Sequence, residues 1–250
     1  VFRTEGEDAY RSYQRQKEQE VLLPGVAFSF IRRLLSFNEL NPSDPLVEVI
    51  LLSRNDPDTG LRVMNSISHH KLSMTRAVFS QGKSPYRYIP ALDISLFLSA
   101  NEVDVKEAML AGFPAGQVLP TQAQDNLGDN ELRIAFDFDG VIADDSAESI
   151  FQQSKDLRQF HKSELENAGV PHNPGPLAQF LLKISEIQKK ESEHAQINSS
   201  YKPRLWVSIV TARNAPSHER VISTMRSWNI TVNEALFLGG IEKRKVLEVL

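Results

Sequence analysis

The chain has 250 residues, of which 41% are hydrophobic and 24% are charged, which is the composition of an ordinary globular protein. Its formal net charge of -4 at pH 7 leaves no basic excess to neutralise phosphates, so we exclude a role in coating nucleic acid. Cysteine is absent, which excludes disulfides, thiolate zinc sites and cysteine nucleophiles. No apolar run approaches the roughly 20 residues of a membrane span, and the first residues are not signal-like. We expect a soluble, cytoplasmic protein without a membrane partner.

The predicted strands and helices alternate along the chain. Five short apolar runs lack a clean period of two, which is typical of parallel strands covered on both faces. These runs are Val47–Leu52, Ile94–Ser99, Leu132–Phe136, Leu205–Val210 and Ala235–Leu238. Stretches with helical spacing lie between them, at Thr59–His69, Val103–Ala111 and Ser217–Trp228. This alternation predicts an α/β fold of doubly wound parallel sheets with helices on both faces.

The polar stretch 121–130 contains Asp, Asn and Gly and predicts a linker between two halves, 1–120 and 131–250. The halves resemble each other at a fixed offset of 158 residues, the separation of Ser53 and Thr211. Further upstream, Pro24-Gly25 corresponds to Pro174-Gly175 at a slightly shorter offset. A duplicated supersecondary unit explains such matches, although two unrelated units that obey the same packing rules are the alternative. The identical pairs at 158 residues favour duplication: Arg62/Arg220, Val63/Val221, Ala77/Ala235, Phe79/Phe237, Gly82/Gly240 and Leu92/Leu250.

The same comparison predicts that this sequence is truncated. In the first half, Leu92 is followed by the predicted strand Ile94–Ser99, whereas the second half stops at Leu250. The first-half counterpart of Asp137 would likewise precede Val1. We therefore expect a fragment of a longer protein that continues beyond residue 250.

Two carboxylates follow the third predicted strand. Asp137 and Asp139 come directly after Leu132–Phe136, and open α/β sheets bind ligands at the carboxyl ends of their strands. Gly140 allows the backbone to turn away sharply. One carboxylate can attack phosphorus, and the other can protonate the leaving oxygen and later deprotonate a water. Both tasks need a hard cation, and oxygen ligands suit Mg2+.

Two other interpretations compete with a phosphatase. An EF-hand calcium loop needs Gly at its sixth position, which here is Ile142, and a preceding helix, where a strand is predicted. A plain acidic turn that caps a helix stays open as the second alternative. The place of the two carboxylates, behind a buried strand and before Gly140-Val141, favours the phosphatase.

Residues suited to bind a phosphate follow the next two predicted strands. Thr211-Ala212-Arg213-Asn214 come after Leu205–Val210, and a hydroxyl with backbone N–H groups at a strand end binds phosphate well. Lys243 comes after Ala235–Leu238, where its charge could neutralise the nucleophile and the transferred group. Taken alone, Thr211 could be only a helix cap and Lys243 an exposed charge. Their order behind the two carboxylates is what predicts a phosphatase.

This order resembles the haloacid-dehalogenase-like (HAD-like) phosphatases, which share a Rossmann-like core, and most closely the cytosolic type I 5′-nucleotidases with their bacterial relatives. The resemblance implies Mg2+-dependent hydrolysis of nucleoside 5′-monophosphates through an aspartyl-phosphate. It makes Asp137 the nucleophile and Asp139 the acid/base, both as metal ligands, and Thr211 and Lys243 the phosphate binders. The superfamily's last acidic motif is missing, in agreement with truncation. The matching segments are SRNDPDTGLRVMNSISHH, Gly82–Asn101, RIAFDFDGVIADDSAE, NPGPLAQFL, VTARNAPSHERV and MRSWNITVNEALFLGG.

The resemblance also assigns the remaining segments. Residues 144–203 would form a small helical cap, with a long irregular insertion as the alternative. The first half would be a degenerate HAD-like unit without the nucleophile motif, in which Ser53-Arg54-Asn55 stand in the place of the Thr211 motif. These residues would bind part of the substrate or a regulatory nucleotide, or would only support the sheet. A homo-oligomer is compatible with this organisation.

Two competing functions follow from the same residues. One is a HAD-type phosphatase that acts on another small phosphate ester, such as a sugar phosphate. The other is a nucleotide-binding regulatory protein without turnover, but such a protein has no need for two mutually repelling carboxylates at Asp137 and Asp139.

Overall fold

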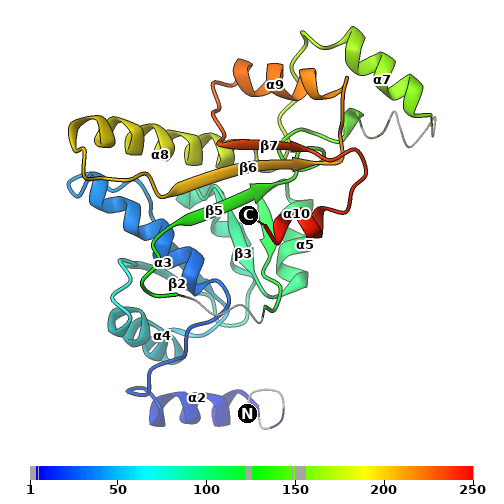
Figure 1. Ribbon diagram of the computed structural model, residues 1–250. Coiled ribbons are helices and arrows are strands. Elements are labelled where there is room, and N and C mark those ends of the chain that lie inside the picture. The colour runs from blue at the N-terminus through cyan, green and yellow to red at the C-terminus, as the bar shows by residue number, and fades with distance from the viewer. Residues whose placement is uncertain (1–3, 5, 122–125, 148, 150–155, 250) are drawn as a thin grey trace. The chain divides into compact units, whose positions relative to one another are not determined.

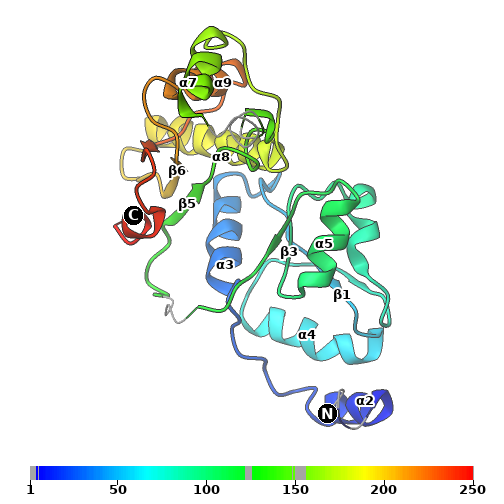
Figure 2. The same ribbon diagram turned by 90° about the vertical axis from the view of Figure 1, so that its right-hand side faces the viewer.

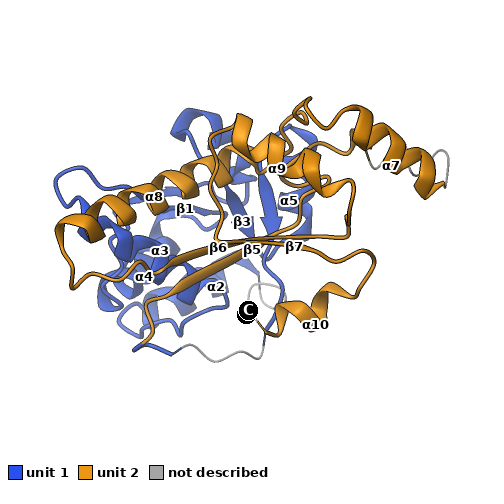
Figure 3. Cartoon of the chain, turned by 45° about the horizontal axis from the view of Figure 1, so that its top comes forward, with its two compact units in different colours: residues 1–128 blue, residues 129–250 orange. Residues whose placement is uncertain are grey.

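The structure is a computed structural model that describes residue 4 and residues 6–121, 126–147, 149 and 156–249. It divides into two compact units, residues 1–128 and residues 129–250 (Figure 3). The division falls inside the predicted linker 121–130, of which residues 122–125 lie outside the described part. Each unit has a mixed α/β structure with small parallel sheets and is considered by itself.

The first unit contains two parallel strand pairs, which include the strands labelled β2 and β3 in Figure 1. Strand β1 (Ile50–Ser53) pairs with β2 (Arg76–Phe79), and β3 (Phe97–Ser99) pairs with β4 (Ala115–Gln117). Its α-helices are α2 (Glu7–Gln16), α3 (Phe28–Ser36), α4 (Pro57–His69) and α5 (Glu102–Leu110). Short 3-10 helices lie at η1 (Phe37–Leu40), η2 (Pro85–Tyr88) and η3 (Pro90–Leu92).

Apolar side chains from these elements form the core of the first unit. Leu35, Ile67 and Met74 form one buried cluster, and Ile89, Phe97 and Ala108 form another. Helix α4 begins where the sequence provides a cap, because Asp56 accepts a hydrogen bond of 2.8 Å from the Thr59 N–H. The helix thus starts directly after β1, so the loop between them is short and its residues are held at the strand end.

The second unit is built on a three-stranded parallel sheet in the order β5-β6-β7. Its strands are β5 (Leu132–Phe136), β6 (Leu205–Thr211) and β7 (Glu234–Phe237). Strand β6 is central, and Val207 and Ile209 are completely buried, which explains its continuous apolar run. Because the strands are parallel, their carboxyl ends meet at one edge of the sheet.

Helices cover both sides of this sheet. Helices α8 (Ala178–Ile197) and α9 (His218–Ser227) lie on one side and α10 (Lys243–Leu247) lies on the other (Figures 1 and 3). Apolar residues at helical spacing in α8, including Leu181 and Ile184, are buried against the sheet. Helix α7 (Leu157–Glu166) lies beside α9 (Figure 2). Within the predicted cap 144–203, α8 therefore packs on the sheet and α7 on a helix.

All five predicted strands and all three predicted helices are present, with ends that differ by up to three residues. Strands β2 and β4 were not predicted. Strand β4 has the sequence Ala-Gly-Gln and β2 begins with Arg76, so neither has an apolar run of strand length. Strand β2 is stabilised by pairing with β1, and strand β4 by pairing with β3, which the local sequence does not indicate.

The two units share backbone features at the same sequence offsets. The Ser80 N–H donates to Ser53 O, and the Leu238 N–H donates to Thr211 O, each at 3.0 Å. Lys71 and Asn229 both have a positive φ, of 54° and 55°. Helices α2 and α7 have the same length and lie 150 residues apart at both ends. The likeness of the halves therefore extends from the sequence to the hydrogen-bond pattern.

Among the described residues, no helix combines the length and the apolar character needed to cross a membrane.

Candidate active site

The loop after β5 places Asp137 and Asp139 at the carboxyl edge of the sheet. Gly140 has a φ of 70°, a conformation that favours glycine, and the chain turns back on itself there. The backbone N–H groups of Ile142 and Ala143 both donate to Phe138 O at 2.9 Å. This tight turn gives the two carboxylates a defined position.

Asp137 contacts Lys243, which the sequence predicted as its partner. The Lys243 Nζ lies 2.5 Å from Asp137 Oδ2, and the Phe138 N–H donates to Asp137 Oδ1 at 2.8 Å. The side chains of Lys243 and Asp137 are 32% and 42% exposed, so the pair is open to a ligand. Lys243 is the first residue of α10, which follows β7. The structure therefore brings together residues from the ends of two strands.

The Thr211 motif lies at the end of β6, between these two strands. Thr211 is fully buried, and its Oγ1 accepts a hydrogen bond of 3.2 Å from the Arg213 N–H. Ala212 and Asn214 are exposed at the same edge. The Gly239 N–H donates to Arg213 O at 3.3 Å, so the loops after β6 and β7 are joined.

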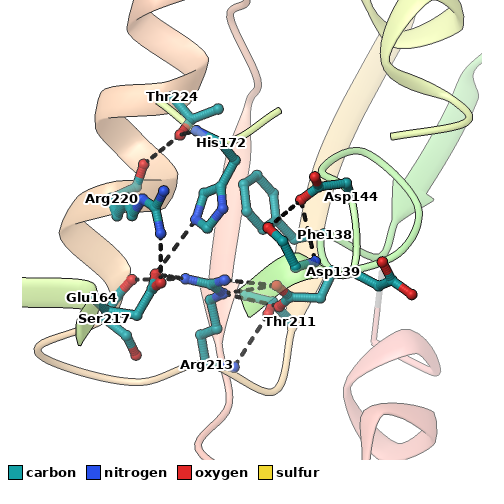
Figure 4. A network of polar contacts seen from close by, with 12 residues as sticks. Phe138, Asp139, Asp144, Glu164, His172, Thr211, Arg213, Ser217, Arg220 and Thr224 are labelled. Atoms are coloured by element: carbon teal, nitrogen blue, oxygen red, sulfur yellow. Dashed lines mark hydrogen bonds and ion pairs between the residues drawn. The ribbon is translucent and has the colours of Figure 1, made fainter. Parts of the chain in front are cut away.

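The Arg213 side chain points to the other carboxylate (Figure 4). Its Nη2 donates to Asp139 Oδ1 at 2.7 Å and its Nε to Asp139 Oδ2 at 2.9 Å. A third donor, Nη1, contacts Glu164 Oε2. Burial opposes the charge of this group, but the hydrogen bonds and charges of Asp139 and Glu164 raise its pKa. The guanidinium, predicted to bind phosphate, thus contacts two carboxylates in the structure.

Glu164, His172 and Arg220 complete this network and were not predicted from the sequence to belong to the site. Arg220 Nη1 donates to Glu164 Oε1 at 2.8 Å, and His172 Nε2 lies 3.4 Å from Glu164 Oε2. Burial alone would raise the pKa of Glu164, but His172, Arg213 and Arg220 outweigh it and lower the pKa to about 2. Glu164 lies in a polar helix 49 residues from Arg213, so no local spacing connects them.

Asp144 fixes the far end of the β5 loop. It accepts hydrogen bonds from Ser146 and from Asn173 Nδ2, the latter at 2.9 Å. These bonds outweigh partial burial and lower the pKa of Asp144. An open depression lies beside this loop, lined by Gly140, Asp144, Asp145, Pro174, Gly175 and Pro176.

In the first unit, Ser53, Arg54 and Asn55 lie at the end of β1. Ser53 Oγ accepts a hydrogen bond of 3.1 Å from the Asn55 N–H, as Thr211 does from Arg213. Arg54 donates to the buried carboxylate of Asp104, which raises the pKa of the guanidinium. The Arg54 side chain is therefore engaged within its own unit, although 39% of it is exposed.

The donor atoms at the β5 edge suit a hard divalent cation. Asp137 and Asp139 offer carboxylate oxygens and their side chains are 42% and 21% exposed. Mg2+ is commonly held by one or two carboxylates, with water and substrate phosphates as its other ligands. In the part of the chain that the structure describes, no group of three or more His, Cys, Asp or Glu side chains is placed to hold a metal. Asp137 and Asp139 are thus the carboxylates that the described residues place at this edge.

Comparison with known proteins identifies the family. The model of the 5′-nucleotidase family matches residues 1–250, and the chain belongs to that family. Human cytosolic 5′-nucleotidase 1B is 32% identical to it over 253 aligned positions, which cover 99% of this chain and 41% of that protein. The chain thus spans about two fifths of the length of this relative. No solved structure matches.

Proposed function

We propose that the protein hydrolyses nucleoside 5′-monophosphates to a nucleoside and phosphate. The observation that carries this proposal is the pair Asp137–Lys243, at 2.5 Å, at the carboxyl edge of the sheet in a chain of the 5′-nucleotidase family. Asp139 lies two residues further, and Thr211 ends the neighbouring strand. The resemblance to a cytosolic relative supports a cytosolic protein.

In the proposed mechanism, an Asp137 oxygen attacks phosphorus and the bond from phosphorus to the nucleoside oxygen breaks. Asp139 gives that oxygen a proton, which completes the nucleoside. Asp139 then takes a proton from a water, whose oxygen attacks the aspartyl-phosphate and releases phosphate. Lys243 balances the negative charge of Asp137 and of the transferred group. A Mg2+ ion held by Asp137 and Asp139 would supply further positive charge at the phosphate.

We further propose that both units have a Rossmann-like, HAD-like fold and arose by duplication. The equal strand registers, the matched hydrogen bonds and the paired positive-φ residues support this proposal. The second unit would then be the catalytic one, since it carries Asp137 and Asp139. The proposed cap is the segment around α7, because α8 packs on the sheet.

The first test is phosphate release from a panel of nucleoside 5′-monophosphates and sugar phosphates, with and without Mg2+. Wild type is expected to turn over nucleotides only with Mg2+, and Asp137→Asn to lose this activity because the amide is no nucleophile. The full-length protein is the sample. Turnover of sugar phosphates but not of nucleotides would overturn the proposal in favour of a different phosphatase.

A further inference from the structure

Four charged side chains, one of them the proposed acid/base, form a largely buried network. This charged cluster consists of Asp139, Glu164, Arg213 and Arg220 (Figure 4). The side chains of Glu164 and Arg213 are 1% and 2% exposed, whereas that of Asp139 is 21% exposed. Only Asp139 has a part in the proposed chemistry, so the three others need a separate explanation.

Arg213 is held from several directions. Its fork donates to both oxygens of Asp139, and Nη1 contacts Glu164. The guanidinium carbon lies 5.4 Å from the ring centroids of both Phe138 and Phe160. A two-pronged contact fixes the plane of a carboxylate, which a single hydrogen bond does not. The orientation of Asp139 therefore depends on Arg213.

Glu164 connects this contact to helix α7. It accepts from Arg213 on one side and from Arg220 on the other, and Arg220 Nε donates to Val170 O at 2.9 Å. Removing Glu164 would leave the buried Arg213 with a single carboxylate partner. Arg213 could then adopt other orientations, and Asp139 with it.

The first unit has corresponding contacts in which neutral side chains replace Glu164 and Arg213, while Arg62 keeps the charge of Arg220. Arg62 Nε donates to Glu20 O at 2.8 Å, as Arg220 does to Val170 O. Arg62 Nη1 donates to Gln14 Oε1 at 3.3 Å, so Gln14 on α2 stands where Glu164 stands on α7. Asn55 likewise takes the place of Arg213, since each N–H donates to the hydroxyl at the end of the preceding strand.

Comparison of the two units distinguishes contacts that the fold uses in both units from charges found only beside Asp139. Gln14 and Asn55 are neutral, and the described residues of the first unit include no counterpart of Asp137 and Asp139, so the contacts of Arg62 form there without a buried Glu–Arg pair. Buried ion pairs are costly to desolvate and are weak evidence for stability. The charges occur in the unit that carries Asp139, which indicates a role in its chemistry.

We propose that Arg213 and Glu164 are positioning residues that hold the Asp139 carboxylate in the orientation needed to transfer protons. The proposal rests on the proposed phosphatase mechanism. Because Glu164 lies on α7 and contacts Arg213, the orientation of Asp139 also depends on the position of α7.

The test compares two esters in the full-length protein with Mg2+. A nucleoside 5′-monophosphate needs a proton on its leaving oxygen, whereas p-nitrophenyl phosphate releases a stable anion and needs little help. Glu164→Gln is expected to lower kcat/KM for the nucleotide at least about tenfold more than for the nitrophenyl ester. Arg213→Lys should do the same, because an ammonium group cannot form the fork.

Gln14→Ala is the matched control, since it removes the same contact in the first unit. Its ratio of the two kcat/KM values should equal that of wild type. An equal loss for both esters in Glu164→Gln and Arg213→Lys, or no loss, would overturn the positioning role.

The wild-type results keep the two proposals distinct. If wild type hydrolyses the nitrophenyl ester but no nucleotide, the nucleotidase proposal fails. An alkyl phosphate that wild type does hydrolyse then replaces the nucleotide, and its kcat/KM is compared with that of p-nitrophenyl phosphate. If wild type hydrolyses no phosphate ester, both proposals are overturned.

Discussion

Lys243 is the cation that contacts the proposed nucleophile. Replacing it by methionine keeps much of the side-chain length but removes the cation that contacts Asp137 at 2.5 Å. We expect kcat to fall on the order of 10²–10³-fold, the usual cost of losing one donor that stabilises a transition state. Phosphate release under saturating substrate is the measurement. Lys245→Met, an exposed position on the same helix, should keep wild-type activity.

Glu164 gives the protein a predictable response to acid. Its pKa is lowered from 4.5 to about 2, so its ionised form stabilises the fold above pH 4.5 and this stability is lost as the pH falls towards 2. The shift corresponds to a contribution on the order of 3 kcal/mol. Denaturant unfolding at pH 7 and pH 3 should show a smaller pH dependence in Glu164→Gln than in wild type.

Glu166→Gln is the control for this titration. Glu166 lies on the same helix, its side chain is 64% exposed, and its nearest cation is 3.9 Å away. Exposed pairs of this kind contribute little to stability. Its variant should therefore follow wild type at both pH values, and an equal response of the two variants would contradict the assignment to Glu164.

Among the connecting loops, the one that follows β5 depends on a close approach of two backbones. A Cβ on Gly175 would lie 2.3 Å from Ala143 O, and the Gly175 N–H donates to Ile142 O at 2.8 Å. Gly175→Ala must displace this loop, and we expect a loss of about 2 kcal/mol in the free energy of unfolding. Gly169, in the same unit, has no atom within 4 Å of such a Cβ and has no positive φ.

Gly169→Ala is thus the control and should be neutral or slightly stabilising. Chemical denaturation of both variants gives the comparison. Because Gly175 packs against the loop that carries Asp139, Gly175→Ala should also lower phosphatase activity. Equal stability of the two alanine variants would show that the β5 loop accommodates the extra methyl group.

At the level of strands and helices, the sequence predicted the parts that have strong local patterns. Leu132–Phe136 is a strand with the predicted bounds, and β6 continues one residue further, to Thr211. Lys243 and Asp137 are 106 positions apart in sequence, yet the order of strands was enough to predict that they meet. Parallel strands bring their carboxyl ends together whatever the length of the connection.

The rest of the site depends on contacts that no local pattern records. Glu164 lies on a helix with few apolar residues, where a carboxylate is ordinarily a solvated surface charge. Its burial results from the packing of α7 beside α9. Arg213 was predicted to bind phosphate because it follows Thr211, but its side chain direction is determined by Asp139 and Glu164.

At the scale of the whole molecule, the same hydrogen bond can be removed once in each unit. Ser66 Oγ accepts from the Leu22 N–H and Thr224 Oγ1 from the His172 N–H, each at 3.0 Å. Ser66→Ala and Thr224→Val each leave a backbone donor without this partner, at a cost of about 1–3 kcal/mol. Only Thr224→Val should also lower turnover, because Thr224 holds His172 beside Glu164.

Unfolding in urea and phosphate release are the two measurements for this pair. Loss of activity in Ser66→Ala as large as in Thr224→Val, at equal stability, would show that the first unit has a direct part in the reaction.

Gln14 and Asn55, the neutral residues of the first unit, also suggest how strongly each unit is constrained in sequence. Gln14 and Asn55 stand where Glu164 and Arg213 stand, but among the described residues neither of them contacts a carboxylate of the proposed chemistry. Under the proposed mechanism we expect a change at either position to affect folding alone, and a change at Glu164 or Arg213 to affect folding and catalysis together. If the two units arose by duplication, as proposed, we expect these positions to tolerate more substitutions in the first unit than in the second.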